Sequence, residues 1–333
     1  MTFTFKKLHV LALVAILPAL ATLPALAQEV KQVRIGGVPN DSNVAIPVQA
    51  AFALGAFKQA GVDVKFTGYN GGSAAMEALA AGAADVAVFT PSGTSLAVKR
   101  GIEAKVIAVG LTGNKSWRVI VKAGSPIKDV KDLKGKKVGI TSSGSSTDML
   151  ALWLSKTYNL DLTRIPVGGA GLGPSVLSGN VDAVVTYPQV AYSLEAEGKV
   201  THILDFGDVD ALKTMVQSCW VASDAAIEKN PEGLKRMLNG LFSAVVYMKK
   251  HPEWAKPFIM KTMKVDAKVA DQEYSDAVLD YSSDGSISPE AVKASLVFLP
   301  LLGEKDFPKN KQIYTDALVP AKTFEIKEAN AKP

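Results

Sequence analysis

The sequence has little cysteine, little histidine and no large excess of either charge. Its single cysteine, Cys219, excludes an internal disulfide, and a chain of this size buries enough apolar surface to fold without one. Because residues 218–221 have the pattern of a strand, Cys219 is expected to be a small buried hydrophobe rather than a reactive thiol. The three histidines form no pair with one another or with Cys219. No metal site, no cofactor and no catalytic residue is therefore predicted.

Charge and apolar runs locate a leader segment. Lys6 and Lys7 precede an apolar run over residues 8–26, and the run ends in a small-residue cleavage pattern at Ala27. This is typical of a secretory signal peptide over residues 1–27, with the mature chain beginning at Gln28. A membrane anchor is the alternative, but two prolines interrupt the run. Without the leader the formal charge falls from +5 to +3, which excludes the strongly basic balance of a nucleic-acid-binding protein.

The chain repeats itself at an offset of 97 residues. Residues 71–110 and 168–207 align without a gap and share eight of forty positions. Most of the matches punctuate structure, in the order of a turn, a short helix, a strand, a strand-end proline and a second helix. Two copies of one α/β unit predict two similar lobes, and a crevice between lobes is a common place for a small ligand. The identical pairs are Gly71/Gly168, Gly72/Gly169, Gly82/Gly179, Asp85/Asp182, Val88/Val185, Pro91/Pro188, Gly101/Gly198 and Gly110/Gly207.

Strand patterns alternate with helix patterns up to residue 222, which predicts parallel-rich sheets flanked by helices. Expected strands cover 33–38, 62–66, 86–89, 105–111, 118–121, 138–140, 181–185, 202–206 and 216–222. Expected helices cover 45–58, 73–81, 94–99, 146–157 and 190–197. From residue 223 onward the pattern is helical, with helices opening near Pro231 and Pro252 and two more over 267–279 and 289–299.

These elements predict a two-lobed α/β fold with a two-crossing hinge. The first lobe is expected over 28–117 plus 221–333, which makes it discontinuous, with the helical segment as its cover. The second lobe is expected over 118–220. The stretches around Trp117 and Arg118 and around Ser218–Trp220 are expected to absorb the dihedral changes when the lobes close.

Several segments together resemble a known family, and the resemblance spans nearly the whole mature chain. They are Gly71-Gly72-Ser73, residues 82–87, residues 132–140 followed by 143–146, residues 179–183, and 221–223 with 229–232. In order and spacing they are similar to periplasmic substrate-binding proteins of ABC importers, in the branch of sulfonate, taurine and nitrate binders and NMT1/THI5-like proteins. The resemblance implies a type II-like binding-protein fold, a periplasmic location and delivery of a small molecule to the transmembrane subunits of a permease. A monomer is expected.

One segment departs from the family pattern. Where the family often has Trp-Glu-Pro, this chain has Thr186-Tyr187-Pro188. An aromatic ring is kept but the carboxylate is absent, so the family's ligands do not transfer directly.

Ligands of parallel α/β lobes sit beyond the carboxyl ends of the strands, where helices begin. Five loops meet this condition here, over 39–43, 69–73, 90–92, 141–147 and 187–189, and several are rich in Gly, Ser and Thr. Amides at helix starts favour an anionic group. The predicted ligand-binding residues are Ser42, Asn43, Gly72, Ser73, Thr90, Ser92, Ser143, Ser145, Ser146, Thr147, Tyr187, Arg118 and Trp220.

Each of these residues also has a structural interpretation. Hydroxyls at helix starts are ordinary N-caps, Tyr187 could pack between lobes, and Trp220 could belong to a core. Arg118 could bind a carboxylate or sulfonate, or form a salt bridge at the hinge. Asp41 or Asp148 would select an amine-bearing ligand if either faced the cleft.

Capture without chemistry is the leading functional hypothesis, with a small organic anion such as a sulfonate, a taurine-like compound or a carboxylate as the ligand. The alternatives are a binder of a pyrimidine precursor of thiamine, a THI5-like enzyme, and a periplasmic sensor that shares the fold.

Overall fold

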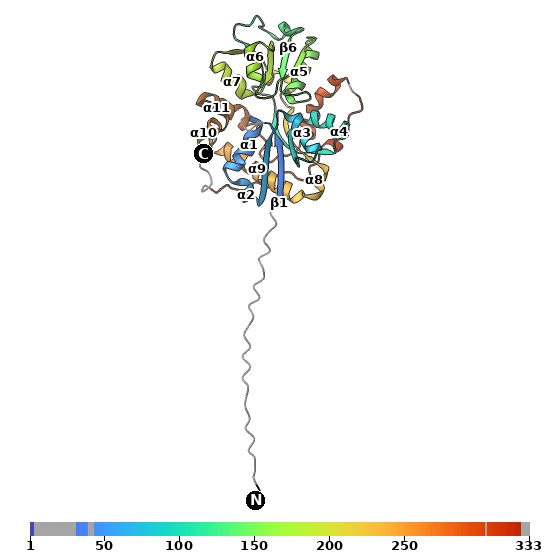
Figure 1. Cartoon of the computed structure of the whole chain (residues 1–333), viewed down its shortest axis with the longest axis vertical. Helices are drawn as coiled ribbons and strands as arrows, with labels where there is room; N and C mark the ends of the chain where they lie inside the picture. The colour runs from blue at the N-terminus through green and yellow to red at the C-terminus, as the bar shows by residue number, and fades with distance from the viewer. Residues whose placement is uncertain (3–30, 39–42, 304, 328–333) are drawn as a thin grey trace.

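The computed structural model describes residues 1–2, 31–38, 43–303 and 305–327. The expected signal peptide, its cleavage after Ala27, and the candidates Asp41 and Ser42 lie outside these residues. Two lobes, each with its own five-stranded sheet, lie one above the other in the view of Figure 1. The predicted α/β fold with two similar lobes is therefore confirmed.

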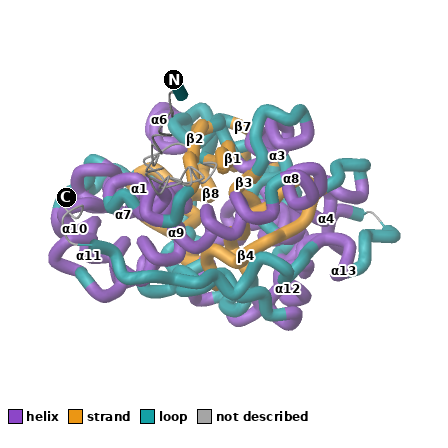
Figure 2. The backbone as a smooth tube through the Cα atoms, turned by 90° about the horizontal axis from the view of Figure 1, so that it is seen from below, coloured by secondary structure: helices purple, strands orange, loops and turns teal. Residues whose placement is uncertain are grey.

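The first sheet has the strand order β2-β1-β3-β10-β4. Strands β1 (Lys31–Gly37), β2 (Val62–Gly68) and β3 (Val86–Phe89) run parallel to one another. Strand β10 (Val216–Ser223) runs antiparallel to both β3 and β4 (Ala104–Thr112). Helices lie on both faces of the sheet when the molecule is seen from below (Figure 2).

The second sheet repeats this plan in the order β7-β6-β8-β5-β9. Strands β6 (Lys137–Ile140), β7 (Thr163–Pro166) and β8 (Ala183–Thr186) are parallel. Strand β5 (Arg118–Lys122) is antiparallel to β8 and to β9 (Val200–Asp205). In each sheet the antiparallel strand beside the central strand, β10 in the first and β5 in the second, directly follows a crossing between the lobes.

The 97-residue repeat is visible in the folded elements. Strand β3 and strand β8 are related by that offset, and so are the helices that follow them, α4 (Pro91–Lys99) and α7 (Pro188–Ala196). Each of these helices begins at a proline, whose missing N–H is not needed at that position. The predicted strands match the observed ones within a few residues, but the sequence analysis missed β7. Helix α6 (Leu172–Ser178) is the short helix that the repeat implies in its second copy.

The helices pack by the apolar faces that their sequences supply. Helix α9 (Pro231–Lys250) is an example. Asn230 caps its start by accepting a hydrogen bond from the amide of Gly233 at 3.1 Å, and the apolar side chains of the helix are buried at helical spacing against the first sheet. The predicted helix over 45–58 is two helices, because Gly55 adopts a left-handed conformation with φ 65°. The remaining helices are α1 (Ile46–Ala53), α2 (Ala56–Gln59), α3 (Gly72–Ala80), α5 (Ser146–Thr157), α8 (Asp224–Lys229), α9 (Pro231–Lys250), α10 (Pro252–Met263), α11 (Ala267–Glu273), α12 (Pro289–Ser295) and α13 (Asn310–Ile313).

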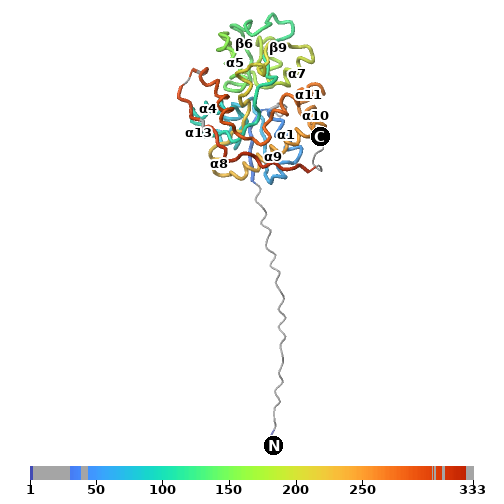
Figure 3. The backbone as a smooth tube through the Cα atoms, turned by 180° about the vertical axis from the view of Figure 1, so that it is seen from behind, coloured from blue at the N-terminus to red at the C-terminus, as the bar shows by residue number. Residues whose placement is uncertain are grey.

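The C-terminal segment covers the first lobe but also reaches the second. Figure 3 shows it on two sides of the molecule, with α10 and α11 on one side and α13 on the other. A π-helical turn, Tyr274–Val278, follows α11, and a 3-10 helix, Leu296–Leu302, follows α12. The first places Asp276 against α7, and the second places Phe298, 1% exposed, in the core of the second lobe. The helical segment is thus more than a cover of one lobe.

The crossings between the lobes differ from the expected boundaries at one end. Residues 113–117 lead from β4 into β5, at the expected place. Strand β10, however, pairs with β4 from Val216 onward, so a boundary at 220 falls inside a strand of the first sheet and the return crossing ends before Val216. Residues 218–220, expected at the hinge, lie within the first sheet and pair with its neighbouring strands. The two crossings lie side by side, with the amide of Gly113 donating to the carbonyl of Met215 at 2.7 Å.

Candidate functional site

A cavity of about 40 Å³ lies between the lobes, where parallel strands of both sheets end. At the ends of β1, β3, β6 and β8, the cavity is lined by Val38, Phe89, Thr141 and Tyr187, as expected for ligand sites of α/β folds. From the first lobe the lining residues are Val38, Val44, Gly72, Val88, Phe89 and Ser218. From the second lobe and the adjoining crossing they are Trp117, Thr141, Ser145, Ser146, Thr147 and Tyr187.

The lobes touch beside this cavity. The hydroxyl of Ser73, in the first turn of α3, donates a hydrogen bond to the carbonyl of Ser143 in the second lobe at 2.7 Å. Helix α3 and helix α5 therefore begin close together on opposite walls. The first amides of an α-helix have no acceptor within the helix, so Gly72 and Ser146 bring two positively polarised helix starts to the cavity.

The absence of a side chain at Gly72 also allows close packing against Phe89. A Cβ atom at this position would lie 2.7 Å from Cδ2 of Phe89, and one at Gly93 would lie 2.4 Å from Cε1 of the same ring. The phenyl ring is therefore held between two glycines on the cavity wall.

The hydroxyls of the 141–147 loop bind one another. Thr141 Oγ1 lies 2.8 Å from Ser145 Oγ and 3.0 Å from Thr147 Oγ1, and the last two oxygens are 3.0 Å apart. Three hydroxyls joined in this ring use their three protons among themselves. Ser145 also caps α5 by accepting from the amide of Asp148 at 3.3 Å. The hydroxyls of Ser145 and Thr147, predicted to hold an oxyanion, are occupied within the protein.

Trp117 and Tyr187 form the aromatic part of the second-lobe wall. Their rings meet edge to face with centroids 6.1 Å apart, an arrangement that aromatic pairs prefer. Trp117 is 4% exposed, and its indole Nε1 has no hydrogen-bond partner among the described residues. Trp117 was not among the predicted ligand-binding residues.

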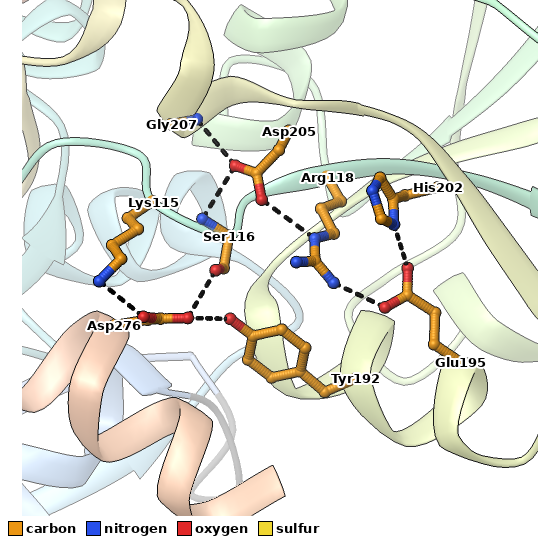
Figure 4. Close-up of polar contacts among 9 residues, drawn as sticks. All are labelled: Lys115, Ser116, Arg118, Tyr192, Glu195, His202, Asp205, Gly207 and Asp276. Atoms are coloured by element: carbon orange, nitrogen blue, oxygen red, sulfur yellow. Dashed lines mark hydrogen bonds and ion pairs between the residues drawn. The ribbon is translucent and has the colours of Figure 1, made fainter.

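Arg118 lies outside the cavity lining. Its guanidinium pairs with Glu195 at 2.6 Å and with Asp205 at 3.1 Å, and it lies over the ring of Tyr192 at 4.8 Å (Figure 4). Burial opposes the charge of Arg118, but the hydrogen bond to Asp205 and the charge of Glu195 outweigh that effect, so its pKa is raised. The arginine therefore has the structural role of a salt bridge that joins β5, α7 and β9.

The same region ties the C-terminal segment to the second lobe. Asp276 pairs with Lys115 at 2.7 Å and accepts hydrogen bonds from the hydroxyls of Ser116 and Tyr192 at 2.8 and 2.5 Å (Figure 4). Burial would raise the pKa of Asp276, but these donors stabilise its charge and lower the pKa. Ser116 has φ 62°, an unusual value for a residue with a side chain, and its amide donates to Asp205 at 3.0 Å. The first crossing is thus fixed by Asp276 of the C-terminal segment and by Asp205 of the second lobe.

The other predicted residues lie in the walls, in caps or in a core. Thr90 caps α4 by accepting from the amide of Gly93 at 3.0 Å, and Ser92 is buried beside it; neither lines the cavity. Trp220, 3% exposed, belongs to the core of the first lobe. Ser143 contributes its carbonyl to the lobe contact, and the side chain of Asn43 lies outside what the structure describes. The cavity lining includes five of the predicted residues: Gly72, Ser145, Ser146, Thr147 and Tyr187.

Asp148 also serves the fold. Its carboxylate accepts a hydrogen bond from the amide of Gly144 at 2.7 Å and pairs with Arg164. It therefore fixes the loop at the start of α5, and it is not one of the residues that line the cavity.

No histidine, cysteine, lysine, arginine, aspartate or glutamate is among the described residues that line the cavity. His202 contacts Glu195 at 2.8 Å and His251 contacts Glu253 at 2.9 Å, and neither histidine lines the cavity. The thiol of Cys219 is buried, which raises its pKa strongly. Among the described residues no group of three or more His, Cys, Asp or Glu is arranged to hold a metal ion. No described helix is both long enough and apolar enough to cross a bilayer.

The architecture is that of the periplasmic binding proteins. The alkanesulfonate-binding protein SsuA from Xanthomonas axonopodis pv. citri, solved with MOPS bound, superposes with a TM-score of 0.71 at 16% identity, over 90% of this chain and 100% of that one. The sequence model of the NMT1/THI5-like family matches residues 42–255. The chain belongs to this family.

Curated relatives cover most of the chain. A binding protein from Brucella abortus is 27% identical over 282 residues, which are 81% of this chain and 86% of the relative. An aliphatic sulfonates-binding protein, so named in Bacillus subtilis, is 27% identical over 250 residues, 73% of each chain. The family also includes an enzyme by name: a 4-amino-5-hydroxymethyl-2-methylpyrimidine phosphate synthase of Candida albicans is 24% identical over 237 residues, 66% of this chain and 69% of that one.

Proposed function

We propose that this protein is the solute-binding component of an ABC importer. It captures a small organic anion between its lobes in the periplasm and delivers the anion to the transmembrane subunits of a permease. The observation that carries the proposal is the cavity where strands of both sheets end and where α3 and α5 begin. The names of the relatives from Brucella and Bacillus support the same role.

The proposal includes secretion and cleavage of residues 1–27 after Ala27, and a monomer as the working form. It includes no chemistry on the ligand. Amides at the helix starts are suited to bind an anion, and the lining residues that the structure describes include no histidine, cysteine, aspartate or glutamate that would act as a general base.

A second candidate ligand is a pyrimidine precursor of thiamine. The aromatic pair of Trp117 and Tyr187 on the wall favours a flat ring, and the name of the Candida relative fits this ligand. The same binding assay decides between the two candidates. Turnover of a bound pyrimidine by the purified protein would instead show a THI5-like enzyme.

The test is a thermal-shift panel of sulfonates, carboxylates, nitrate and pyrimidines on the purified mature protein. A ligand at a hundred times its Kd stabilises the folded state by about 2.7 kcal/mol, which for a chain of this length raises Tm by roughly 4 °C. If only a pyrimidine raises Tm, the ligand class is the second candidate. If no compound of any class does so, the proposed function is wrong.

A further inference from the structure

The first crossing between the lobes contains a tight turn, residues 114–117, which we call the hinge turn. The amide of Trp117 donates to the carbonyl of Asn114 at 3.0 Å, which closes the turn. Ser116, its third residue, has φ 62° and is 3% exposed. A positive φ at this place favours glycine, because a Cβ atom makes the left-handed conformation costly. Such a conformation persists only where the surrounding structure holds it.

Two carboxylates hold Ser116, one from each lobe (Figure 4). Asp205, at the end of β9 in the second sheet, accepts a hydrogen bond from the Ser116 amide at 3.0 Å. Asp276 accepts one from the Ser116 hydroxyl at 2.8 Å. The residue after Asp276, Ala277, is 1% exposed in the core of the first lobe. A single residue of the hinge turn is therefore bound to both lobes at once.

The same two carboxylates bind further groups that fix their positions. Asp276 also accepts from the hydroxyl of Tyr192 in α7, and Asp205 from the amide of Gly207 at 2.9 Å. A Cβ atom on Gly207 would lie 2.7 Å from Cα of Lys115, so the chain beyond β9 packs closely on the hinge turn. Because Asp205 belongs to the second lobe and Asp276 to the segment packed on the first, rotation of one lobe relative to the other changes the distance between the two acceptors.

Lys264 supplies the comparison within the same molecule. It also has a positive φ, 57°, but it ends α10, where a left-handed residue is common. Among the described non-glycine residues with positive φ, only Ser116 lies in a crossing. An effect of the left-handed conformation on stability alone would be shared by both positions, whereas an effect on the arrangement of the lobes would belong to Ser116.

We propose that Ser116 is the residue at which the hinge switches. While both carboxylates hold it in the left-handed conformation, the lobes stay in contact at Ser73 and Ser143. When the lobes separate, Ser116 loses its bond to Asp276 and returns to a negative φ, which releases the cost of its Cβ atom. Trp117, the next residue, lines the cavity, so the switch also moves part of the cavity wall. The inference goes beyond the proposed function, because it requires no particular ligand.

The experiment measures the distance between two spin labels by pulsed electron paramagnetic resonance, on the mature protein without added ligand. Glu77→Cys in α3 and Lys156→Cys in α5 carry the labels at exposed positions of the two lobes. These helices begin at the contact between the lobes, so the label distance lengthens when the lobes separate. The native thiol of Cys219 is buried and stays unlabelled.

The informative comparison is between Ser116→Ala and Ser116→Gly, which both lose the hydrogen bond to Asp276. In Ser116→Ala the ratio of short to long distances should fall roughly tenfold from the wild-type value. Ser116→Gly also lacks the Cβ atom and adopts a positive φ without that cost. Its ratio should therefore exceed that of Ser116→Ala by roughly five- to thirtyfold. Lys264→Ala and Lys264→Gly are the matched controls and should keep the wild-type distribution.

Each outcome supports or overturns the switch. The same distance distribution in wild type, Ser116→Ala and Ser116→Gly would overturn it. Equal shifts in the two Ser116 variants would also overturn it, because they would show a lost hydrogen bond and no change of backbone conformation. Either failure leaves the proposed function standing. That function fails if no compound of the thermal-shift panel raises Tm, a result that does not depend on the label distances.

Discussion

Glu273 at the end of α11 provides the sharpest stability prediction. Its carboxyl is 0% exposed, and neither oxygen has a hydrogen-bond partner among the described residues. Burial, with a smaller effect from the charge of Asp276, raises its pKa to about 8. A carboxyl without donors is accommodated in its protonated form, because an unpaired buried charge costs far more than a neutral group.

The sign and size of the effect follow from the two pKa values. The unfolded carboxyl ionises above its usual value of 4.5, whereas the folded one stays protonated to about 8. The contribution of Glu273 to folding is therefore complete below pH 4.5 and is lost as pH rises through 8. At about 1.36 kcal/mol per pH unit, the loss is roughly 3 kcal/mol at pH 7 and approaches 5 kcal/mol above pH 8. Glu273→Gln has the same shape and no charge, so it avoids this loss.

The assay is urea unfolding of wild type and Glu273→Gln at pH 5, 6, 7 and 8. We expect the variant to gain in relative stability by roughly 1 kcal/mol per pH unit over this range. Glu228→Gln, at an exposed position of α8, is the control and should show no such slope. A stability difference between Glu273→Gln and wild type that stays constant from pH 5 to pH 8 would refute the protonated state of Glu273.

Three further predictions concern the groups around the crossings and the core. Arg118→Met leaves the carboxylates of Glu195 and Asp205 without their cation and should lower the free energy of unfolding by about 3–5 kcal/mol in urea titrations. The ligand Kd should stay within about twofold of the wild-type value. A large change in Kd would show that Arg118 contributes to ligand binding. Asp276→Asn should lower the free energy of unfolding by about 1–3 kcal/mol at pH 7 in the same urea titrations. Because the pKa of Asp276 in the folded protein is lowered below 3.8, the stability difference from wild type should disappear as pH falls through that pKa. A stability difference that persists in acid would contradict this role of the Asp276 charge. Cys219 should not react with a thiol reagent at pH 8 in the native protein and should give one equivalent after denaturation, since burial raises its pKa strongly; rapid native labelling would show that the first-lobe core opens.

The architecture was predictable because it depends on periodic features. Alternating strand and helix patterns and the 97-residue repeat gave the two sheets, and the prolines at positions 91 and 188 marked equivalent helix starts. Short elements without strong periodicity, such as β7, were missed. The boundary at 220 was misplaced because the sequence of β10 predicts a strand but does not show which sheet the strand joins. Only its pairing with β3 and β4 assigns it to the first sheet.

The cavity lies where the sequence analysis expected a ligand site, but its lining differs from the predicted set of residues. The rule that ligands sit beyond strand ends located the cavity loops, but the selection of polar residues passed over Phe89 and Val38, which occupy those same strand ends. Hydroxyl groups in a sequence give no sign that they will bind one another, as in the ring of Thr141, Ser145 and Thr147. Trp117 was noticed only as part of a hinge, because nothing local shows that its indole N–H ends up without an acceptor.

Phe298 has a consequence for any attempt to divide this molecule. The ring belongs to the C-terminal segment, yet it fills a place in the core of the second lobe, next to residues of α5. A fragment cut at the two crossings would leave a void in that core, at a cost of about 3–5 kcal/mol by comparison with phenylalanine truncations. Residues 296–302 therefore form a third connection between the lobes, in addition to the two crossings. Any rotation of one lobe relative to the other must either move these residues with the second lobe or use them as a pivot.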